Sequence, residues 1–300
     1  MWRPAWPCPA GRILAVHRRG AGDPTYRVDP DGAHWRAVRT PLGAATLRVT
    51  TRPGEGTVVA SAWGPGAVWV LDRVPALLGA DDDPSGFVPG HPVLADAWRR
   101  HRHWRIGRSD LLVEALVPAI IEQKVTGQEA FAGFRRLVHR FGEPAPGPDA
   151  ARLGLRLQPD PETLRTLPSW EWLRLPVDPA RSRAVVGVAG RAGSLLRLGE
   201  LAHADADRRL RSLPGVGVWT SAEARARAYG DPDAVSFGDY HVARDIGWAL
   251  TGSALDDAGL ARLLEPWQGH RYRVQALVGL AGLGHPRRGP RMAPRGHLPR

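Results

Sequence analysis

Hydrophobic and polar residues alternate over short stretches in about the first 72 residues, and turn sequences such as PDG, RPGEG and WGPG separate these stretches. A period of two between turn signals is typical of β-strands in an antiparallel arrangement. The expected strands cover residues 25–28, 33–40, 45–51, 56–61 and 67–71. The pattern therefore predicts a small antiparallel sheet, followed by a short helix at residues 72–79.

From about residue 91 the hydrophobic positions recur at helical spacing. Pro118 falls inside the pattern of residues 110–142, so a break or kink is expected near Val117. The expected helices lie at 92–106, 110–142, 180–198, 205–213, 219–230, 242–250, 257–267 and 273–283. The prediction is an α+β protein with three parts: a β-rich domain at 1–90, a larger helical domain at 91–285 and a disordered basic tail at 286–300.

The charge of the chain is unusual, whereas its hydrophobic content of 43% is ordinary for a globular protein. The formal net charge is +11, and Lys124 is the one lysine among many arginines. Codon usage in a GC-rich genome would explain the shortage of lysine but not the net charge. Because guanidinium groups pair well with phosphate, a polyanion is the expected partner.

Cysteine content and hydropathy narrow the class of protein further. Cys8 is the single cysteine, which excludes an intramolecular disulfide and any all-cysteine zinc or iron–sulfur site. No stretch approaches the roughly 18 apolar residues that a membrane span requires. We therefore expect a soluble, cytoplasmic protein without membrane contact.

The stretch LPGVGVWTSA, residues 213–222, predicts a tight turn between two helices. Gly215 and Gly217 allow the backbone to turn sharply and a phosphate to approach closely. The amides of Val216, Gly217 and Trp219 would then point outward at the positive end of the following helix, as a phosphate clamp that reads no base sequence. The alternative is a glycine C-cap followed by an ordinary helix start.

Three further segments accompany this hairpin: IIEQKVTGQEA at 120–130, AVSFGDYHVARDIGWAL at 234–250 and EPWQGHRYRV at 265–274. Together, and in this order, the four motifs resemble the helix-hairpin-helix superfamily of DNA glycosylases, most closely its 3-methyladenine DNA glycosylase II branch. The resemblance covers about residues 95–283, with a weaker likeness in the sheet region. It implies that the helical domain is a glycosylase domain.

The resemblance implies that Asp239 is the catalytic carboxylate. An ionised carboxylate stabilises the positive charge that develops on the sugar, and the following helix start would favour the charged form. An aspartate that merely caps this helix is the alternative. Asp231, Asp233 and Asp245 are poorer candidates, since two lie in a turn and one lies inside a helix.

The resemblance also implies a loop that enters the minor groove, carrying Gln123, Lys124 and Thr126. Relatives often have Leu or Gln where Lys124 stands, so a charged residue is a departure, and a solvated helix-end lysine is the alternative. The remaining expected DNA contacts come from the hairpin: Pro214, Gly215, Val216, Gly217, Trp219 and Thr220.

In the family, aromatic residues wall the base pocket, and Trp219 and Tyr240 occupy such positions here. Aromatic faces attract cationic alkylated purines, although Trp219 could instead be a core residue. Glu223 stands where an aromatic residue is expected. The family hairpin further implies a monovalent cation on the backbone carbonyls of Arg211, Leu213 and Val216, and no other cofactor.

The expected function is a monomeric, monofunctional glycosylase that excises alkylated purines from double-stranded DNA, because Trp219 replaces the lysine of members that also cut the backbone. Two alternatives remain open. One is a non-catalytic DNA-binding protein that uses the hairpin only as a clamp. The other is a bifunctional glycosylase/lyase acting through Lys124.

Overall fold

The computed structural model describes residues 1–286, and the expected basic tail at 286–300 lies almost wholly outside the described residues. Four strands form one antiparallel sheet in the order β1-β2-β3-β4. They are β1 (Tyr26–Val28), β2 (His34–Thr40), β3 (Gly43–Arg52) and β4 (Thr57–Trp63). The predicted α+β class and the first four predicted strands are confirmed.

The fifth expected strand is wrong, because residues 67–71 lie in helix α2 (Ala67–Asp72). Val70 is buried and is followed four residues later by the buried Val74, while Val68 is 67% exposed. This is helical spacing, which an apolar run of only five residues does not distinguish from a strand. Short elements around the sheet are α1 (Ala10–Leu14), α3 (Val74–Leu77), and the 3-10 turns Ala15–His17 and Pro53–Glu55.

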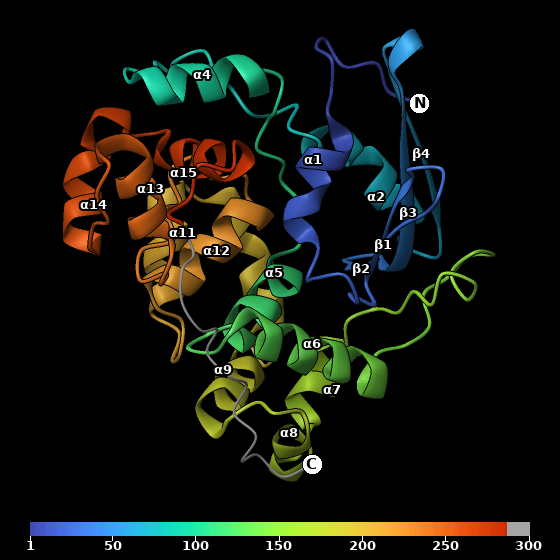
Figure 1. Ribbon diagram of the computed structural model, residues 1–300. Coiled ribbons are helices and arrows are strands. Elements are labelled where there is room, and N and C mark those ends of the chain that lie inside the picture. The colour runs from blue at the N-terminus through green and yellow to red at the C-terminus, as the bar shows by residue number, and fades with distance from the viewer. Residues whose placement is uncertain (287–300) are drawn as a thin grey trace.

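The remaining regular elements of the described chain are helices, and they lie beside the sheet in Figure 1. They are α4 (Pro92–His101), α5 (Leu112–Ile121), α6 (Gly127–Phe141), α7 (Pro161–Thr166), α8 (Ser169–Arg174), α9 (Pro179–Ala189), α10 (Ala192–Leu195), α11 (His203–Arg211), α12 (Val218–Ala228), α13 (Val242–Thr251), α14 (Asp257–Leu263) and α15 (Arg271–Leu280), with 3-10 turns at Leu196–Glu200 and Glu265–Trp267.

The helix break predicted near Val117 occurs later in the chain. Helix α5 continues through Pro118 to Ile121, and the chain leaves the helix at residues 122–126. Leu116, Val117 and Ile120 are completely buried, so packing around α5 outweighs the hydrogen bond that proline removes. Lys124 then adopts a left-handed backbone with φ 54°, which separates α5 from α6.

The sheet and the helical part are joined by shared packing. One hydrophobic cluster contains Val38 and Leu47 of the sheet together with Ala222 and Ala226 of α12. Residues 143–158, within the range expected for the helical domain, return to the sheet, where Thr46 Oγ1 donates to the Pro146 carbonyl at 2.6 Å. The first strands therefore support the same helix that carries the predicted hairpin.

Candidate active site

The hairpin between α11 and α12 packs against the protein interior through Val216 and Gly215. Val216 is 3% exposed, and its amide donates to the Leu213 carbonyl at 3.0 Å. Gly215 has φ +81°, and a Cβ at this position would lie 2.5 Å from the Cβ of Ala184. Only glycine fits this turn. The helix-hairpin-helix arrangement is confirmed, but the expected outward direction of the Val216 amide is wrong because the turn itself uses that amide.

The start of α12 has the features of an anion site. Gly217 is exposed, and a Cβ built on it would meet no atom within 4 Å. The first bond into the helix runs from the Ser221 amide to the Gly217 carbonyl at 2.9 Å, so the amides before Ser221 precede the helical ladder. These amides lie at the positive end of the helix dipole. A phosphate can therefore approach the backbone here without steric hindrance.

Gln123 connects the loop between α5 and α6 to this hairpin. Its Nε2 donates to the Gly215 carbonyl at 2.8 Å and to Thr220 Oγ1 at 2.7 Å. Thr220 is 2% exposed, so its side chain serves the hairpin, and its expected DNA contact stays a prediction. Gln123 thus holds two segments together that are about 90 residues apart in the chain.

The neighbours of Gln123 have different surroundings. Lys124 is exposed at the tip of the loop. Thr126 caps α6 in a capping box with Glu129: its Oγ1 accepts from the Glu129 amide at 3.3 Å, and its amide donates to Glu129 Oε2 at 2.9 Å. Of the three expected loop contacts, Lys124 is therefore the one whose side chain extends from the loop, while Gln123 and Thr126 shape it.

Asp239 lies across from the first turn of α12. Its Oδ2 accepts a hydrogen bond from Trp219 Nε1 at 3.1 Å. Its Oδ1 accepts from the amides of His241 at 2.7 Å and Val242 at 3.2 Å, at the start of α13. The same carboxylate thus caps a helix with one oxygen and faces the hairpin helix with the other, so capping and catalysis are compatible roles.

The other three aspartates are held elsewhere. Asp231 is 1% exposed and pairs with Arg225. Asp233 pairs with Arg271, and Asp245 Oδ1 accepts from the His285 amide at 2.9 Å. Asp239 is accordingly the carboxylate of this group that contacts the first turn of the hairpin helix, whereas Asp231 contacts its last turn through Arg225.

The residues expected to line the base pocket differ in exposure. Tyr240 is 73% exposed, and the guanidinium of Arg244 lies 5.4 Å from its ring centre. Glu223 is nearly buried on α12, one turn after Trp219, and its Oε2 accepts from Arg227 at 2.7 Å. Burial alone would raise the pKa of Glu223, but Arg227, Ser236 and Arg19 together lower it. The carboxylate therefore stays charged at neutral pH.

Sequence reasoning missed the residues around Glu223. Ser236 Oγ donates to Glu223 Oε1 at 2.5 Å, and Gln275 Nε2 donates to Ser236 Oγ at 3.1 Å. Arg19, 7% exposed, pairs with Glu122 at 2.9 Å. Glu122 and Ser236 stand in two of the four motifs, but no sequence signal marks Arg19 or Gln275, because tertiary folding brings them to α12.

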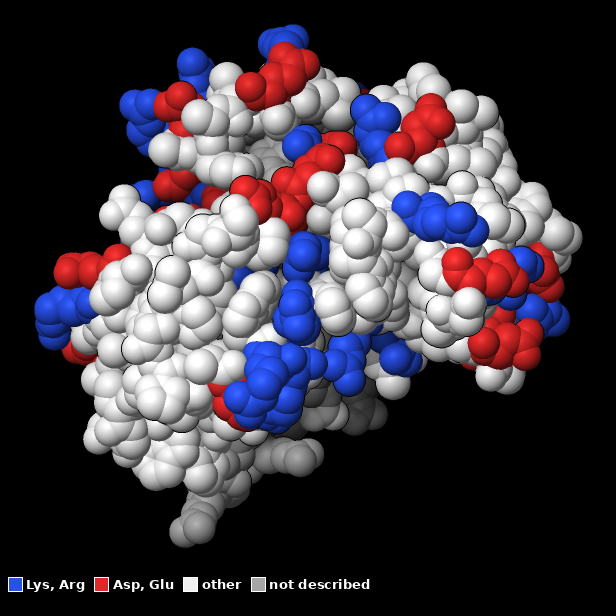
Figure 2. Space-filling model, turned by 90° about the horizontal axis from the view of Figure 1, so that it is seen from above, with Lys and Arg blue, Asp and Glu red and all other residues white. Residues whose placement is uncertain are grey.

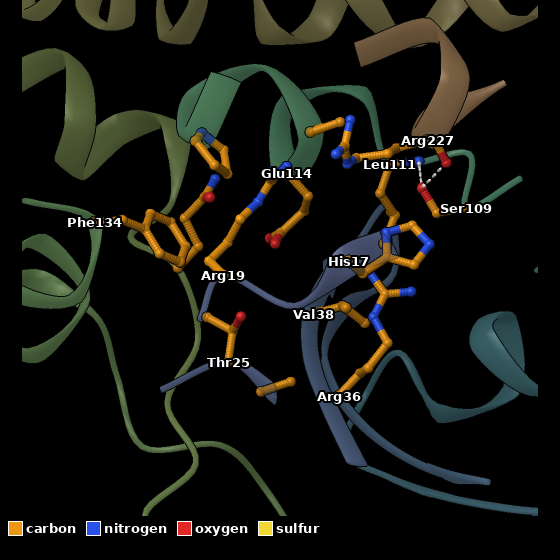
Figure 3. Close-up of a pocket in the computed structure, with 14 residues that line it drawn as sticks. His17, Arg19, Thr25, Arg36, Val38, Ser109, Leu111, Glu114, Phe134 and Arg227 are labelled. Atoms are coloured by element: carbon orange, nitrogen blue, oxygen red, sulfur yellow. Dashed lines mark hydrogen bonds between the residues drawn. The ribbon is translucent and has the colours of Figure 1, made fainter. Parts of the chain in front are cut away.

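A cavity of about 30 Å³, enough for about two water molecules, lies behind these residues. Figure 3 shows Arg19, Glu114 and Arg227 around it, with Arg36 from β2 on the opposite side. Burial raises the pKa of Glu114 to about 7, although the Arg39 amide, which donates to its Oε1 at 3.1 Å, has the opposite effect. The chain thus keeps titratable groups inside the junction of sheet and helices.

Charged side chains form clusters on the surface. Figure 2 shows basic side chains in a column across the middle of one face, beside a group of acidic side chains. The charge on this face is therefore distributed unevenly. Between residues 1 and 286, no helix is both long and apolar enough to cross a membrane.

Among residues 1–286, no group of three or more His, Cys, Asp and Glu side chains is placed to hold a metal ion. The expected monovalent cation would use the carbonyls of Arg211, Leu213 and Val216. Since the Leu213 carbonyl already accepts from the Val216 amide, it has one remaining lone pair for an ion. The cation stays a prediction.

Known proteins resemble this chain in sequence and in fold. No protein-family model matches the chain. Proteins from two Mycobacterium tuberculosis strains, each named probable bifunctional transcriptional activator/DNA repair enzyme AlkA, are 28% identical over 270 residues, which is 80% of this chain and 49% of theirs. The chain thus spans about half the length of these curated relatives.

Solved structures extend the likeness to nearly the whole chain. The 3-methyladenine DNA-glycosylase of Archaeoglobus fulgidus has a TM-score of 0.75 at 19% identity, covering 93% of this chain and 97% of that one. The 8-oxoguanine glycosylase/lyase of Clostridium acetobutylicum, in complex with DNA, has a TM-score of 0.67 at 11% identity, covering 90% and 91%. The predicted resemblance is confirmed: the chain has the fold of the helix-hairpin-helix DNA glycosylases.

Proposed function

We propose that this chain is a DNA N-glycosylase that flips a damaged base out of double-stranded DNA and hydrolyses its bond to the sugar. One observation carries the proposal: Asp239 faces Trp219 at the start of the hairpin helix, at 3.1 Å. A phosphate bound at the α12 start would bring the adjacent sugar close to this carboxylate. The names of the Mycobacterium and Archaeoglobus proteins support a role in DNA repair.

The chemistry follows from the charge that develops during cleavage. As the N-glycosidic bond breaks, the sugar becomes an oxocarbenium-like cation, and an ionised Asp239 would stabilise it and orient the attacking water. The target base cannot be reached inside the duplex, so it must be extruded. Lys124, exposed at the tip of its loop, would enter the space that the base leaves.

We further propose that the reaction stops at an abasic site. A lyase step needs an amine that attacks the sugar, and Trp219 occupies the hairpin position where the family resemblance would place it. Lys124 is the one lysine of the chain. Borohydride added during the reaction should therefore trap no covalent adduct with DNA, whereas a trapped adduct that Lys124→Arg removes would establish the lyase alternative.

The substrates proposed are alkylated purines, because the ring of Trp219 is a stacking surface for a cationic base. The test is a panel of duplexes that each contain a single lesion, incubated with the protein and then cleaved at abasic sites with alkali. Strand cleavage at alkylated purines is expected. Binding of duplex without base release from any lesion would instead favour the non-catalytic alternative.

A further inference from the structure

Two side chains on one face of α12 contact the same short segment. Trp219 reaches Asp239, and Glu223, one helical turn later, reaches Ser236. Gln275 fixes this segment by two hydrogen bonds, from its Nε2 to Ser236 Oγ at 3.1 Å and from the Ser236 amide to its Oε1 at 3.0 Å. A base that stacks on Trp219 near Asp239 would therefore have the Glu223 carboxylate along its edge.

Glu223 has hydrogen-bonding capacity left for such a base. A carboxylate offers about two acceptor sites on each oxygen. Ser236 Oγ uses one site on Oε1 and Arg227 uses one on Oε2, so each oxygen retains one. Both partners donate, which fixes the carboxylate as an acceptor for any third group. Arg19, which is 7% exposed, is a second guanidinium whose charge lowers the pKa of this carboxylate.

A carboxylate next to a guanidinium complements the hydrogen-bonding edge of guanine but not that of adenine. The Watson–Crick edge of guanine has two adjacent donors, N1–H and the 2-amino group, followed by the O6 acceptor. Two carboxylate oxygens accept both donors in the parallel manner of a bidentate pair, and a guanidinium can donate to O6. Adenine derivatives have an acceptor at N1, whose lone pair would face the carboxylate. A polar site that pairs with one edge rejects a base that leaves its groups unpaired.

We propose that Glu223 reads the edge of the extruded base and selects guanine-derived lesions over adenine-derived ones. The proposal rests on the glycosylase function above and specifies its substrate. It also gives a reason for a carboxylate where the family resemblance leads one to expect an aromatic ring: selection here depends on the hydrogen-bonding edge as well as on stacking.

The test uses one DNA substrate that contains both lesions. Duplex DNA treated with methyl methanesulfonate carries 7-methylguanine and 3-methyladenine, which are both cationic, so electrostatic attraction is the same for the two. The bases that the 300-residue chain releases are separated and quantified. Because both come from one tube, their ratio does not depend on the fraction of folded enzyme. The wild-type protein should release a larger fraction of the 7-methylguanine in the DNA than of the 3-methyladenine.

Glu223→Gln keeps the shape of the side chain but replaces an acceptor oxygen with an amino donor. The ratio of 7-methylguanine to 3-methyladenine should fall roughly tenfold, the effect of one hydrogen bond to a charged group. Glu143→Gln, which removes an exposed carboxylate remote from α12, should leave the ratio unchanged. If Glu223→Gln does not fold, Glu223→Asp, which withdraws the carboxylate by one methylene, should lower the ratio in the same direction.

The possible failures are distinguishable. If the wild-type protein releases neither base, the proposed function is wrong. If it releases both and the variants of Glu223 keep the wild-type ratio, the glycosylase function stands and the assignment of Glu223 is overturned.

Discussion

The indole N–H of Trp219 and the Oδ2 of Asp239 are 3.1 Å apart, which joins the first turn of the hairpin helix to the loop before α13. The other oxygen of Asp239 is held by two backbone amides. The carboxylate is thus fixed on both sides, and its orientation relative to the hairpin is set before DNA arrives. Such preorganisation reduces the reorganisation needed at the moment of reaction.

Replacing Trp219 with Phe tests this orientation. An aromatic ring is retained, but the donor to Asp239 is lost, so the carboxylate loses one of its three hydrogen bonds. Base release at saturating enzyme should slow roughly tenfold, since a hydrogen bond to a charged group contributes ~1.5–3 kcal/mol. Affinity for the same duplex should stay unchanged. Single-turnover release and a binding titration measure the two effects, and equal rates for both proteins would show that the indole N–H has no role.

Gln123 provides a second test, on the connection between loop and hairpin. Gln123→Ala removes the bonds to Gly215 and Thr220, so Lys124 and the phosphate site would no longer be held in a fixed relation. We expect slower base extrusion, measured with 2-aminopurine fluorescence next to the lesion, together with weaker binding to an abasic-site duplex.

Gln128 is the matched control for this variant, because it is exposed on α6 near the same loop. Gln128→Ala should behave as the wild-type protein does. If Gln123→Ala and Gln128→Ala give the same extrusion rate, the hydrogen bonds of Gln123 do not organise the DNA-binding face.

Much of this arrangement could be predicted from the sequence. The hairpin follows from a local pattern, since its glycines and the start of the next helix are local features, whereas the role expected of Asp239 rests on the family resemblance. The strand expected at 67–71 failed for the opposite reason. Five apolar residues carry too little periodicity, and packing against β3 and β4 decides their conformation.

The surroundings of Glu223 could not be predicted from local patterns. Arg19, Ser236 and Gln275 come from three separate parts of the chain and meet only in the folded protein. Gln123 has hydrogen-bond partners that could not be predicted, for a related reason. Its position in the loop was read correctly, but its partners lie on the hairpin more than 90 residues away.

Substitutions at Gly215 and Gly217 should affect different properties: the first the stability of the protein, the second its affinity for DNA. Gly215→Ala forces a side chain into a left-handed backbone and against Ala184, so unfolding free energy should fall by about 1–3 kcal/mol. Gly217→Ala meets open space and should leave the melting temperature unchanged.

The same Gly217→Ala change places a methyl group where a phosphate would approach, so affinity for duplex should fall roughly tenfold. Thermal unfolding and fluorescence anisotropy measure both properties in each variant. A Gly217→Ala protein that binds DNA with wild-type affinity would contradict the proposed phosphate site.

Glu114 predicts a pH dependence of stability. Its pKa is raised from an ordinary value of 4.5 to about 7, so the folded state favours the neutral carboxyl. The neutral carboxyl contributes fully to the free energy of unfolding below about pH 4.5. This contribution is lost as the pH rises to about 7, where ionisation of Glu114 lowers the free energy of unfolding by on the order of 3 kcal/mol. Glu114→Gln, neutral at every pH, should be more stable than the wild type at pH 8, and the difference should shrink toward pH 5.

Chemical denaturation of both proteins across this pH range measures the effect, with Glu143→Gln as the control for loss of an exposed carboxylate. Parallel stability curves for the wild type and Glu114→Gln would mean that Glu114 does not titrate between pH 4.5 and 7.

The central claim is that the carboxylate of Asp239 acts on the sugar of an extruded nucleotide. Asp239→Asn retains a carbonyl oxygen to accept hydrogen bonds from Trp219 or from the start of α13, but it removes the negative charge. The matched control is Asp245→Asn, which removes a charge from α13 away from the hairpin.

The decisive measurement is single-turnover release of 7-methylguanine by the wild type and these two variants, with duplex affinity determined on the same preparations. The account predicts that Asp239→Asn binds DNA with nearly unchanged affinity and releases no measurable base, while Asp245→Asn retains release. Base release by Asp239→Asn at the wild-type rate would contradict it.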